Sequence, residues 1–259
     1  MKLGLCTPVA NAPAAKVAGF DFVEENVQSL LHAHDQTVDV WRGADLALSA
    51  PLPVPSANSM VPGHLKITGP QADSAALAKY MTIALSRARR VGITTIVFGS
   101  GAARAVPDGF SHSIAADQIV AFLRSIAPLA DDNAVTIVVE HLNKKECNIL
   151  NGLAEAADIV RRVNHPSVQL LFDSYHFWMD KLPISELKDN LALVRHVHLA
   201  DRDGRVAPGL SQTSDYRPIF NLLKSANYTG RVAIESAPFD IPTQGPQIAS
   251  FVRSTWENS

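Results

Sequence analysis

The chain has 259 residues, of which 47% are hydrophobic and 19% are charged. This composition is typical of a globular protein and supplies enough apolar residues for a sizeable core. The formal net charge of −2 provides no basic surplus for binding phosphates, which argues against a nucleic-acid partner. Cys6 and Cys147 are too few for a disulfide framework, and no apolar run reaches the roughly 18 residues that span a bilayer. We therefore expect free thiols, no membrane association and a cytoplasmic location.

Short apolar runs alternate with helix-length segments along the whole chain. The apolar runs predict strands at Lys2–Cys6, Phe20–Glu24, Val54–Asn58, Thr94–Phe98, Val135–Glu140, Val168–Asp173, Arg195–Leu199 and Arg231–Glu235. Apolar residues at helical spacing predict helices at Asn26–Ala33, Asp73–Arg90, Ala115–Leu129, Leu150–Val163, Ile184–Asn190, Arg217–Ala226 and Gln247–Trp256. Ser113 is the expected cap of the third of these helices.

The strands are continuous apolar runs instead of alternating ones, which suits a parallel sheet buried on both faces. Eight strand–helix units in 259 residues favour a closed (β/α)8 TIM barrel over an open doubly wound sheet. No repeat or linker divides the chain, and we interpret the proline-rich stretch Pro51–Pro62 as a loop near the site. The sequence thus predicts an α/β fold with a single barrel domain over residues 1–259.

Ligand-type residues end four consecutive predicted strands: Glu140, Asp173, His198 and Glu235. In a barrel these strand ends share one rim, where active sites are built. Three carboxylates beside one imidazole repel each other unless a cation lies between them. Any one of them alone is more often a solvent-facing strand end, but four together favour a metal site. Such donors suit Mn²⁺, Mg²⁺ or Co²⁺, with Zn²⁺ a weaker match.

Several further polar residues have both a structural and a functional interpretation. His196 precedes His198 by two residues on the same strand face, which indicates a hydrogen-bonded core histidine. His176 lies three residues past Asp173, where it can reach a substrate or a neighbouring carboxylate. His64 could enter the rim or lie on the surface. Arg104, in the run FGSGAAR, could meet an anion, although this run fits a tight turn better than a phosphate loop.

The motifs VVEHLNKKECNILN (Val138–Asn151), FDSYH, HVHLADRDGR and VAIES resemble the sugar isomerase/epimerase superfamily with xylose isomerase-like barrels. That superfamily includes ketose 3-epimerases, hydroxypyruvate isomerases, inosose dehydratases and endonuclease IV. The resemblance covers at least Thr94 to Glu235. It implies a homodimer or homotetramer that acts on a small carbohydrate. The resemblance also implies metal ligands, which are Glu140, Asp173, His198 and Glu235. It implies that Glu140 and Glu235 are the acid/base pair. The implied substrate contacts are His176, Arg205 and Glu146.

The residue types fit proton transfer beside a carbonyl, with a metal-stabilised enediolate between two glutamates. Return of the proton to the opposite face gives an epimer, and return to the neighbouring carbon gives an isomer. Loss of a hydroxyl would instead give a dehydratase of inosose or dehydroshikimate type, which is the main alternative. A non-catalytic metal-binding barrel is a further alternative. A repair endonuclease is disfavoured because residues 201–216 contain no histidine for a zinc cluster. We favour the isomerase or epimerase because both glutamates are in place.

Overall fold

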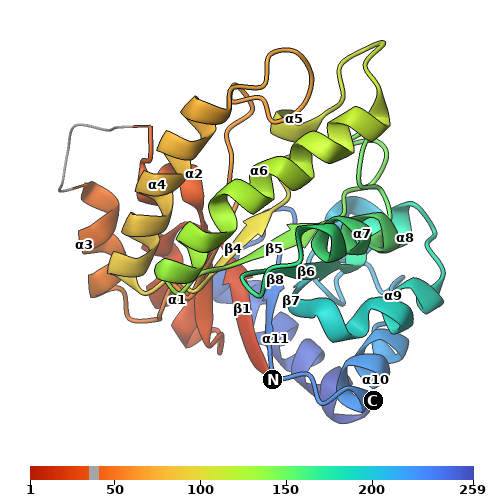
Figure 1. Ribbon diagram of the computed structural model, residues 1–259. Helices are drawn as coiled ribbons and strands as arrows, with labels where there is room; N and C mark the ends of the chain where they lie inside the picture. The colour runs from red at the N-terminus through yellow and green to blue at the C-terminus, as the bar shows by residue number, and fades with distance from the viewer. Residues whose placement is uncertain (35–40) are drawn as a thin grey trace.

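Eight parallel strands close into one barrel, and helices cover its outer face (Figure 1). The computed structural model describes residues 1–34 and 41–259. Neighbouring strands follow chain order, and the last strand pairs in parallel with the first, which confirms the predicted TIM barrel. The strands are β1 (Lys2–Cys6), β2 (Phe22–Asn26), β3 (Ser56–Asn58), β4 (Thr95–Phe98), β5 (Thr136–Glu140), β6 (Val168–Asp173), β7 (Val194–Leu199) and β8 (Arg231–Ile234).

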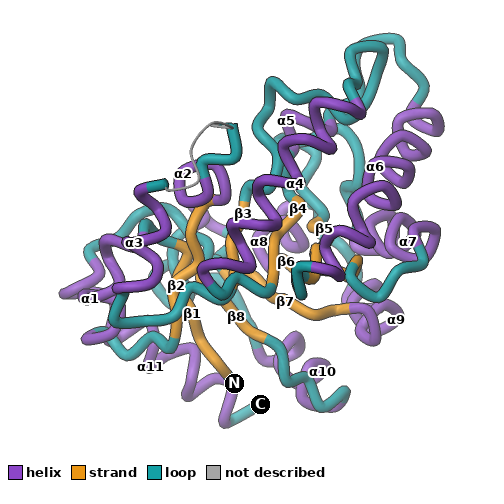
Figure 2. Tube along the Cα trace, turned by 60° about the vertical axis from the view of Figure 1, so that its left-hand side comes forward, coloured by secondary structure: helices purple, strands orange, loops and turns teal. Residues whose placement is uncertain are grey.

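Figure 2 shows the helices arranged around the strands, with both chain ends on the same side of the molecule. The helices are α1 (Ala12–Val17), α2 (Val27–Leu31), α3 (Arg42–Ser49), α4 (Ser74–Val91), α5 (Gly101–Arg104), α6 (His112–Asp132), α7 (Leu153–Val163), α8 (Ser174–Met179), α9 (Ile184–Asn190), α10 (Arg217–Ser225) and α11 (Ile241–Glu257). Three 3₁₀ turns accompany them: η1 (Val9–Asn11), η2 (Leu191–Leu193) and η3 (Asp203–Arg205).

Helix α4 illustrates how the sequence sets these boundaries. The side chain of Asp73 accepts hydrogen bonds from the N–H groups of Ala75 and Ala76, which satisfies two free donors of the first turn. Gly92 ends the helix in the left-handed conformation, with φ of 80°, where a residue without Cβ is unstrained. The predicted helix over Asp73–Arg90 therefore lies within one residue of the observed one.

Helix α6 is long and apolar enough to cross a bilayer by length and composition alone. Its side chains Ile119, Leu123 and Ile126 are buried, and the helix contacts α4, α7 and β5. Packing against the barrel wall therefore accounts for its apolar composition. The helix begins at His112, capped by Ser111 and not by Ser113 as predicted.

Prolines explain the two clearest boundary errors. Strand β3 begins at Ser56 and not at Val54, because Pro55 has no N–H to donate to a neighbouring strand. Helix α11 begins at Ile241, six residues before the predicted start at Gln247. Its early proline lies in the first turn, where no N–H is needed, so proline begins this helix instead of preventing it. Helices α3, α5 and α8 were not predicted.

Inside the barrel, a polar layer lies above an apolar one. Val97, Val138 and Leu171 form a separate buried cluster contributed by β4, β5 and β6. Two residues further along β5 and β6 come Glu140 and Asp173, which share the inward-facing side because strand side chains alternate. The carboxyl ends of the strands thus carry buried charge toward the barrel axis.

Candidate active site

The four predicted strand-end residues do meet at one place in the folded chain. Glu140, Asp173, His198 and Glu235 each offer a ligand atom, and these atoms all lie within 4.8 Å of one another. Three of the side chains are buried, and Glu235 is partly exposed. They come from the ends of β5, β6 and β7 and from the residue after β8, which are consecutive neighbours in the barrel.

His198 occupies the middle of this cluster. Its Nδ1 lies 3.5 Å from Glu140 Oε1, 3.6 Å from Glu235 Oε2 and 3.9 Å from Asp173 Oδ2. Among the described residues, His198 Nδ1, Glu140 Oε1 and Asp173 Oδ2 are buried without a hydrogen-bond partner. Buried polar atoms are normally satisfied, so three unsatisfied ones that face one another indicate a site built for something further.

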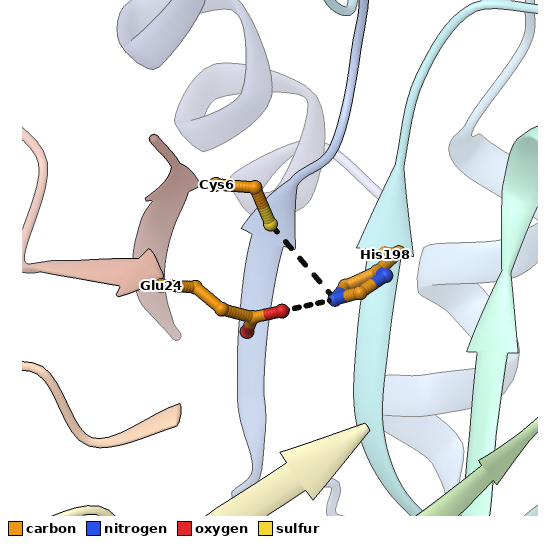
Figure 3. Close-up of side chains that lie close together, drawn as sticks. All are labelled: Cys6, Glu24 and His198. Atoms are coloured by element: carbon orange, nitrogen blue, oxygen red, sulfur yellow. Dashed lines mark hydrogen bonds and ion pairs between the residues drawn. The ribbon is translucent and has the colours of Figure 1, made fainter. Parts of the chain in front are cut away.

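The other nitrogen of His198, Nε2, is hydrogen-bonded to Glu24, the third residue of β2. Glu24 Oε1 lies 2.8 Å from His198 Nε2, as Figure 3 shows, and Oε2 lies 2.7 Å from His196 Nε2. Ser56 Oγ donates to the same Oε2 at 2.6 Å. Glu24 is ionised beside these rings, so Nε2 of each imidazole carries a proton. When the His198 ring is neutral, the lone pair of its Nδ1 therefore faces the cluster.

The charge state of Glu24 follows from these contacts. Burial on its own raises the pKa of the Glu24 carboxyl, but His198 and His196 lower it well below the usual range. Cys6 lies beside the same pair, with its Sγ 4.0 Å from His198 Nε2 (Figure 3). Burial and the charge of Glu24 raise the pKa of the Cys6 thiol, so it stays protonated.

Two carboxyls of the cluster hold protons more tightly than usual. Burial raises the pKa of Asp173 to about 7, and the nearby charge of Glu235 adds to this effect. Burial likewise raises the pKa of Glu140, again with a contribution from Glu235. Carboxylates crowded in a dry pocket resist ionisation, and a cation between them would remove that resistance.

The pKa values of the other two cluster residues, His198 and Glu235, are shifted so that each favours its charged form. Burial opposes the charging of His198, yet Glu24 and Glu235 together raise its pKa well above the usual value. Burial also opposes the ionisation of Glu235, but His198 and Arg205 lower its pKa to about 2. Glu140 and Glu235 therefore differ strongly in proton affinity although they lie on the same rim.

Arg205 places a second layer of polar groups over the cluster. Its Nη2 donates to Glu235 Oε2 at 2.7 Å, and its Nη1 contacts Glu146 Oε2 at 3.3 Å. The guanidinium also lies over the ring of Tyr175, with 4.7 Å from Cζ to the ring centroid. Arg205 is thus fixed by two carboxylates and an aromatic face.

His176 is joined to the same layer through Asn143. Asn143 Nδ2 lies 2.8 Å from His176 Nδ1 and 2.9 Å from Glu146 Oε1. The backbone N–H of His176 donates to Asp173 Oδ1 at 2.9 Å, which ties the first turn of α8 to the metal-ligand candidate. His176 Nε2 is buried and lacks a partner among the described residues, so it can still bind a hydroxyl group.

A cavity of about 290 Å³ opens at the carboxyl ends of the strands, and its lining includes Glu140, Glu146, His176, Arg205 and Glu235. Gly99, directly after β4, forms part of its wall. A Cβ at this position would lie 2.2 Å from Glu140 Oε2, so only glycine leaves room for that carboxylate. The FGSG run thus allows close approach of the backbone to Glu140.

Two predicted substrate contacts are not brought to this cavity. Arg104 is fully buried, and its guanidinium donates to the carbonyl oxygens of Phe98 and Glu140 at 3.0 and 2.8 Å. Its charge is used to fasten the loop after β4, which leaves it unable to meet an anion. His64 is exposed and lines neither the cavity nor the cluster.

Glu24, Asn58 and Asn143 belong to the site but were not predicted. Glu24 carries the same signal as Glu140 and Glu235, because each is a glutamate that closes a short apolar run. Asn58 Nδ2 donates to Glu235 Oε1 at 3.2 Å, across the barrel from β3. Asn143 lies in a loop, where no periodic pattern marks it.

The comparisons with known proteins agree with this geometry. Residues 12–251 match the family model described as "Xylose isomerase-like TIM barrel". The 3-dehydro-D-guloside 4-epimerase of Escherichia coli is 32% identical over 114 residues, which are 44% of this chain and 43% of the relative. A putative hydroxypyruvate isomerase of Mus musculus is 31% identical over 133 residues, 50% of this chain and 47% of the relative.

Among solved structures, D-psicose 3-epimerase from Clostridium cellulolyticum with D-tagatose superposes with a TM-score of 0.84 at 17% identity. That superposition covers 99% of each chain, and at this identity it shows the shared fold. The sequence alignments, by contrast, span less than half of the length of the two curated relatives.

Proposed function

Because the chain belongs to the xylose isomerase-like TIM barrel family, we propose that it is a divalent-metal-dependent epimerase or isomerase of a small carbohydrate or hydroxy-keto acid. The relatives named above are epimerases and isomerases, which makes an enzyme of this kind the natural expectation. The observation that carries the proposal is the cluster around His198 Nδ1, where Glu140 and Glu235 face each other with unsatisfied neighbours.

The donor set of the cluster fits a divalent cation. Three carboxylates and one imidazole match the preferences of Mn²⁺, Mg²⁺ or Co²⁺, and Zn²⁺ is a weaker match. Glu140, Asp173, His198 and Glu235 would hold the ion, with the proton of His198 kept on Nε2 by Glu24. Such an ion stabilises the negative charge that develops when a proton leaves carbon beside a carbonyl, a contribution of several kcal/mol.

Glu140 and Glu235 supply the proton transfers in this proposal. Their oxygens lie 3.5 and 3.6 Å from the same nitrogen, so both carboxyls would lie close to a substrate carbon held at the cluster. The pKa of Glu140 is raised and that of Glu235 is lowered to about 2, the separation under which one group gives a proton while the other takes one. Return to the opposite face gives an epimer, and return to the adjacent carbon gives an isomer.

Arg205, Glu146 and His176 would hold the substrate hydroxyls. All three line the cavity, and His176 Nε2 has no hydrogen-bond partner among the described residues. Arg205 also keeps Glu235 ionised through their 2.7 Å contact, so it assists the proton transfer without touching the proton.

Deuterium exchange tests the proposal. The protein, loaded with Mn²⁺, Mg²⁺ or Co²⁺, is incubated in deuterated water with ketoses, hydroxypyruvate and an inosose, and the products are identified by NMR. We expect exchange of one substrate C–H with no new ultraviolet chromophore. A dehydrated, ultraviolet-absorbing product would show the dehydratase instead, and no exchange with any probe would contradict both. The expected homodimer or homotetramer stays a prediction for sedimentation analysis.

A further inference from the structure

A second group of ligand-type side chains lies at the other nitrogen of the His198 ring. Cys6 ends β1, Glu24 lies on β2 and His198 lies on β7, and the three side chains point toward one another (Figure 3). Cys6 Sγ lies 4.0 Å and Glu24 Oε1 lies 2.8 Å from His198 Nε2. One ligand atom from each residue lies within 4.8 Å of the others, so the three converge on one point.

This group opens onto a cavity. Cys6 and Glu24 both line a space of about 650 Å³ over the ends of β1, β2 and β8. Glu25 and Glu235 also line it, and no lysine or arginine is among its described lining residues. An ion at the carboxylate cluster would offset the charge of Glu235 and leave that of Glu24 and Glu25. Because a concave site lined by one sign of charge concentrates counter-ions, a cation in this cavity meets Cys6 and Glu24 directly.

The spacing of the three atoms is close to that around a tetrahedral ion. Bonds of roughly 2.0–2.3 Å hold the ligand atoms of such an ion about 3–4 Å apart. The 4.0 Å contact between Cys6 and His198 is near this spacing, and the 2.8 Å contact of Glu24 Oε1 has to open by about 0.5 Å. Glu24 Oε2 can keep its bonds to His196 and Ser56 meanwhile. A thiolate favours thiophilic ions over Mn²⁺ and Mg²⁺.

We infer that Cys6, Glu24 and His198 Nε2 form a second cation site, for a thiophilic ion such as Zn²⁺ or Cd²⁺, and that this ion and one at the carboxylate cluster exclude each other. A neutral imidazole has one lone pair, so His198 serves one site at a time. The exclusion rests on the proposed function, which places a metal ion at the cluster, whereas the second site does not. A thiophilic ion would therefore inhibit the enzyme by taking one of its metal ligands.

The proton balance is consistent with this exclusion. The ion replaces the proton of the Cys6 thiol, which passes to solvent, and the proton on His198 Nε2. That second proton passes to solvent from a doubly protonated ring, or to Nδ1 within a neutral one. The Nδ1–H then lies 3.5–3.9 Å from oxygens of Glu140, Asp173 and Glu235, where it takes the place of the cluster ion. A dication with one thiolate, one carboxylate and a neutral ring has no net charge, which suits a buried site.

Cd²⁺ is the probe for the second site, because a Cd²⁺–thiolate bond absorbs in the ultraviolet and Cd²⁺ on carboxylates does not. Metal-free protein is titrated with Cd²⁺. We expect a thiolate band in the unmodified protein and in Cys147→Ser, and no band in Cys6→Ser. Cys147 is the matched control because it is the other cysteine of the chain and its Sγ contacts the carbonyl oxygen of Gly101. No band in the unmodified protein, or a band that survives Cys6→Ser, would overturn the inference.

The same band measures the exclusion. Once the Mn²⁺ concentration exceeds its own Kd, tenfold more Mn²⁺ should raise the Cd²⁺ concentration at the midpoint of the band about tenfold. A midpoint that bound Mn²⁺ leaves unchanged, or that levels off as Mn²⁺ increases, would show both ions bound together and would contradict the shared ring.

The two hypotheses fail separately. Calorimetry records the binding of Mn²⁺ to the unmodified protein directly. If Mn²⁺ does not bind, the proposed function fails and the exclusion fails with it, while the thiolate band still decides the second site. If Mn²⁺ binds and Cd²⁺ gives no thiolate band, the proposed function stands and the second site is wrong.

Discussion

Two layers of buried carboxylate lie one above the other in this barrel, and they are satisfied to very different degrees. In the lower layer, both oxygens of Glu24 are hydrogen-bonded, to His198, His196 and Ser56. In the upper layer, Glu140 Oε1 and Asp173 Oδ2 have no partner among the described residues. All three residues are less than 5% exposed, so burial does not separate them.

The two layers differ in whether their carboxylate oxygens still lack a hydrogen-bond partner. A carboxylate that is buried and fully bonded orients its neighbours, whereas one that is buried with a free oxygen is available to a ligand. In the proposed function, the lower layer therefore supports the site and the upper layer would carry out the chemistry. The predictions that follow test this division.

The largest effect should come from the upper layer. Glu140→Gln and Glu235→Gln each remove a proton-transferring carboxyl and should lower kcat/KM by about 10²–10⁴-fold, measured by deuterium exchange. Both should also weaken Mn²⁺ binding. Glu257→Gln, at an exposed glutamate near the end of α11, is the control and should change neither. Full activity of either site variant after removal of metal by a chelator would contradict the mechanism.

A smaller but more diagnostic effect should come from the lower layer. Glu24→Gln places an amide against two Nε2–H donors, so we expect Mn²⁺ affinity to fall about 10–100-fold by calorimetry. Unfolding in urea should show a loss of about 1–3 kcal/mol.

Asp201→Asn is the matched control for Glu24→Gln. Asp201 is also buried, and it accepts hydrogen bonds from Ser211 and Tyr216 outside the cluster. It should lose similar stability and keep its Mn²⁺ affinity. An equal loss of Mn²⁺ affinity in both variants would show that Glu24 acts only through folding.

The pH dependence of stability should separate metal-loaded from chelated protein. The folded pKa of Asp173 is raised to about 7 by burial, and that of His198 is raised by Glu24 and Glu235 against the effect of burial. At these two groups, the folded protein therefore binds more protons than the unfolded protein above about pH 4, the ordinary range of a carboxyl. Stability from these groups is present at low pH and is lost as the pH rises through the folded values.

The measurement is the Tm between pH 5 and 8 in chelator and in Mn²⁺. In chelator, the Tm of Asp173→Asn should rise relative to that of the unmodified protein as the pH goes from 5 to 8. The buried His141, His176 and His196, whose pKa values burial lowers, contribute a slope of the opposite sign that both proteins share. Mn²⁺ should stabilise the protein more at pH 8 than at pH 5, because the ion competes with protons. A Tm difference between the two proteins that stays constant over this range would contradict a buried, proton-binding Asp173.

The smallest effect should come from a carboxylate outside both layers. Asp21 accepts from Leu3 N–H and from Arg253, and these contacts lower its pKa although partial burial opposes them. Its stabilisation is present above its unfolded pKa, near 4, and is lost as the pH falls through the lower folded value. Asp21→Asn should cost about 1 kcal/mol or less at pH 7 in urea unfolding, with no change in Mn²⁺ affinity. A larger change in Mn²⁺ affinity than in stability would show coupling to the site.

The sequence predicted the barrel well because buried parallel strands leave a strong local signal. Continuous apolar runs and the capping residues of α4 act within a few positions of one another. The four cluster residues were predictable for the same reason, since each is the polar residue at the end of such a run. Helix α8 was missed because it begins immediately after Asp173, where a loop was expected.

What could not be predicted depends on distant partners. Arg104 was expected at an anion, but the carbonyl groups that engage it become neighbours only after folding. Glu24 supports His198 across 174 positions of sequence, a pairing that no local pattern contains. The proton position on an imidazole, which decides whether it can bind a metal, depends on such a partner.

The pairing of β1 with β8 has a consequence for the order in which the molecule is made. Glu24 is synthesised 174 positions before His198, and β8 must follow before the barrel can close. The cluster therefore exists only after β8 has been made. Contacts of such long sequence separation slow folding. Uptake of the ion during refolding would then report the final closure of the barrel, and a truncated nascent chain would carry isolated carboxylates but no metal centre.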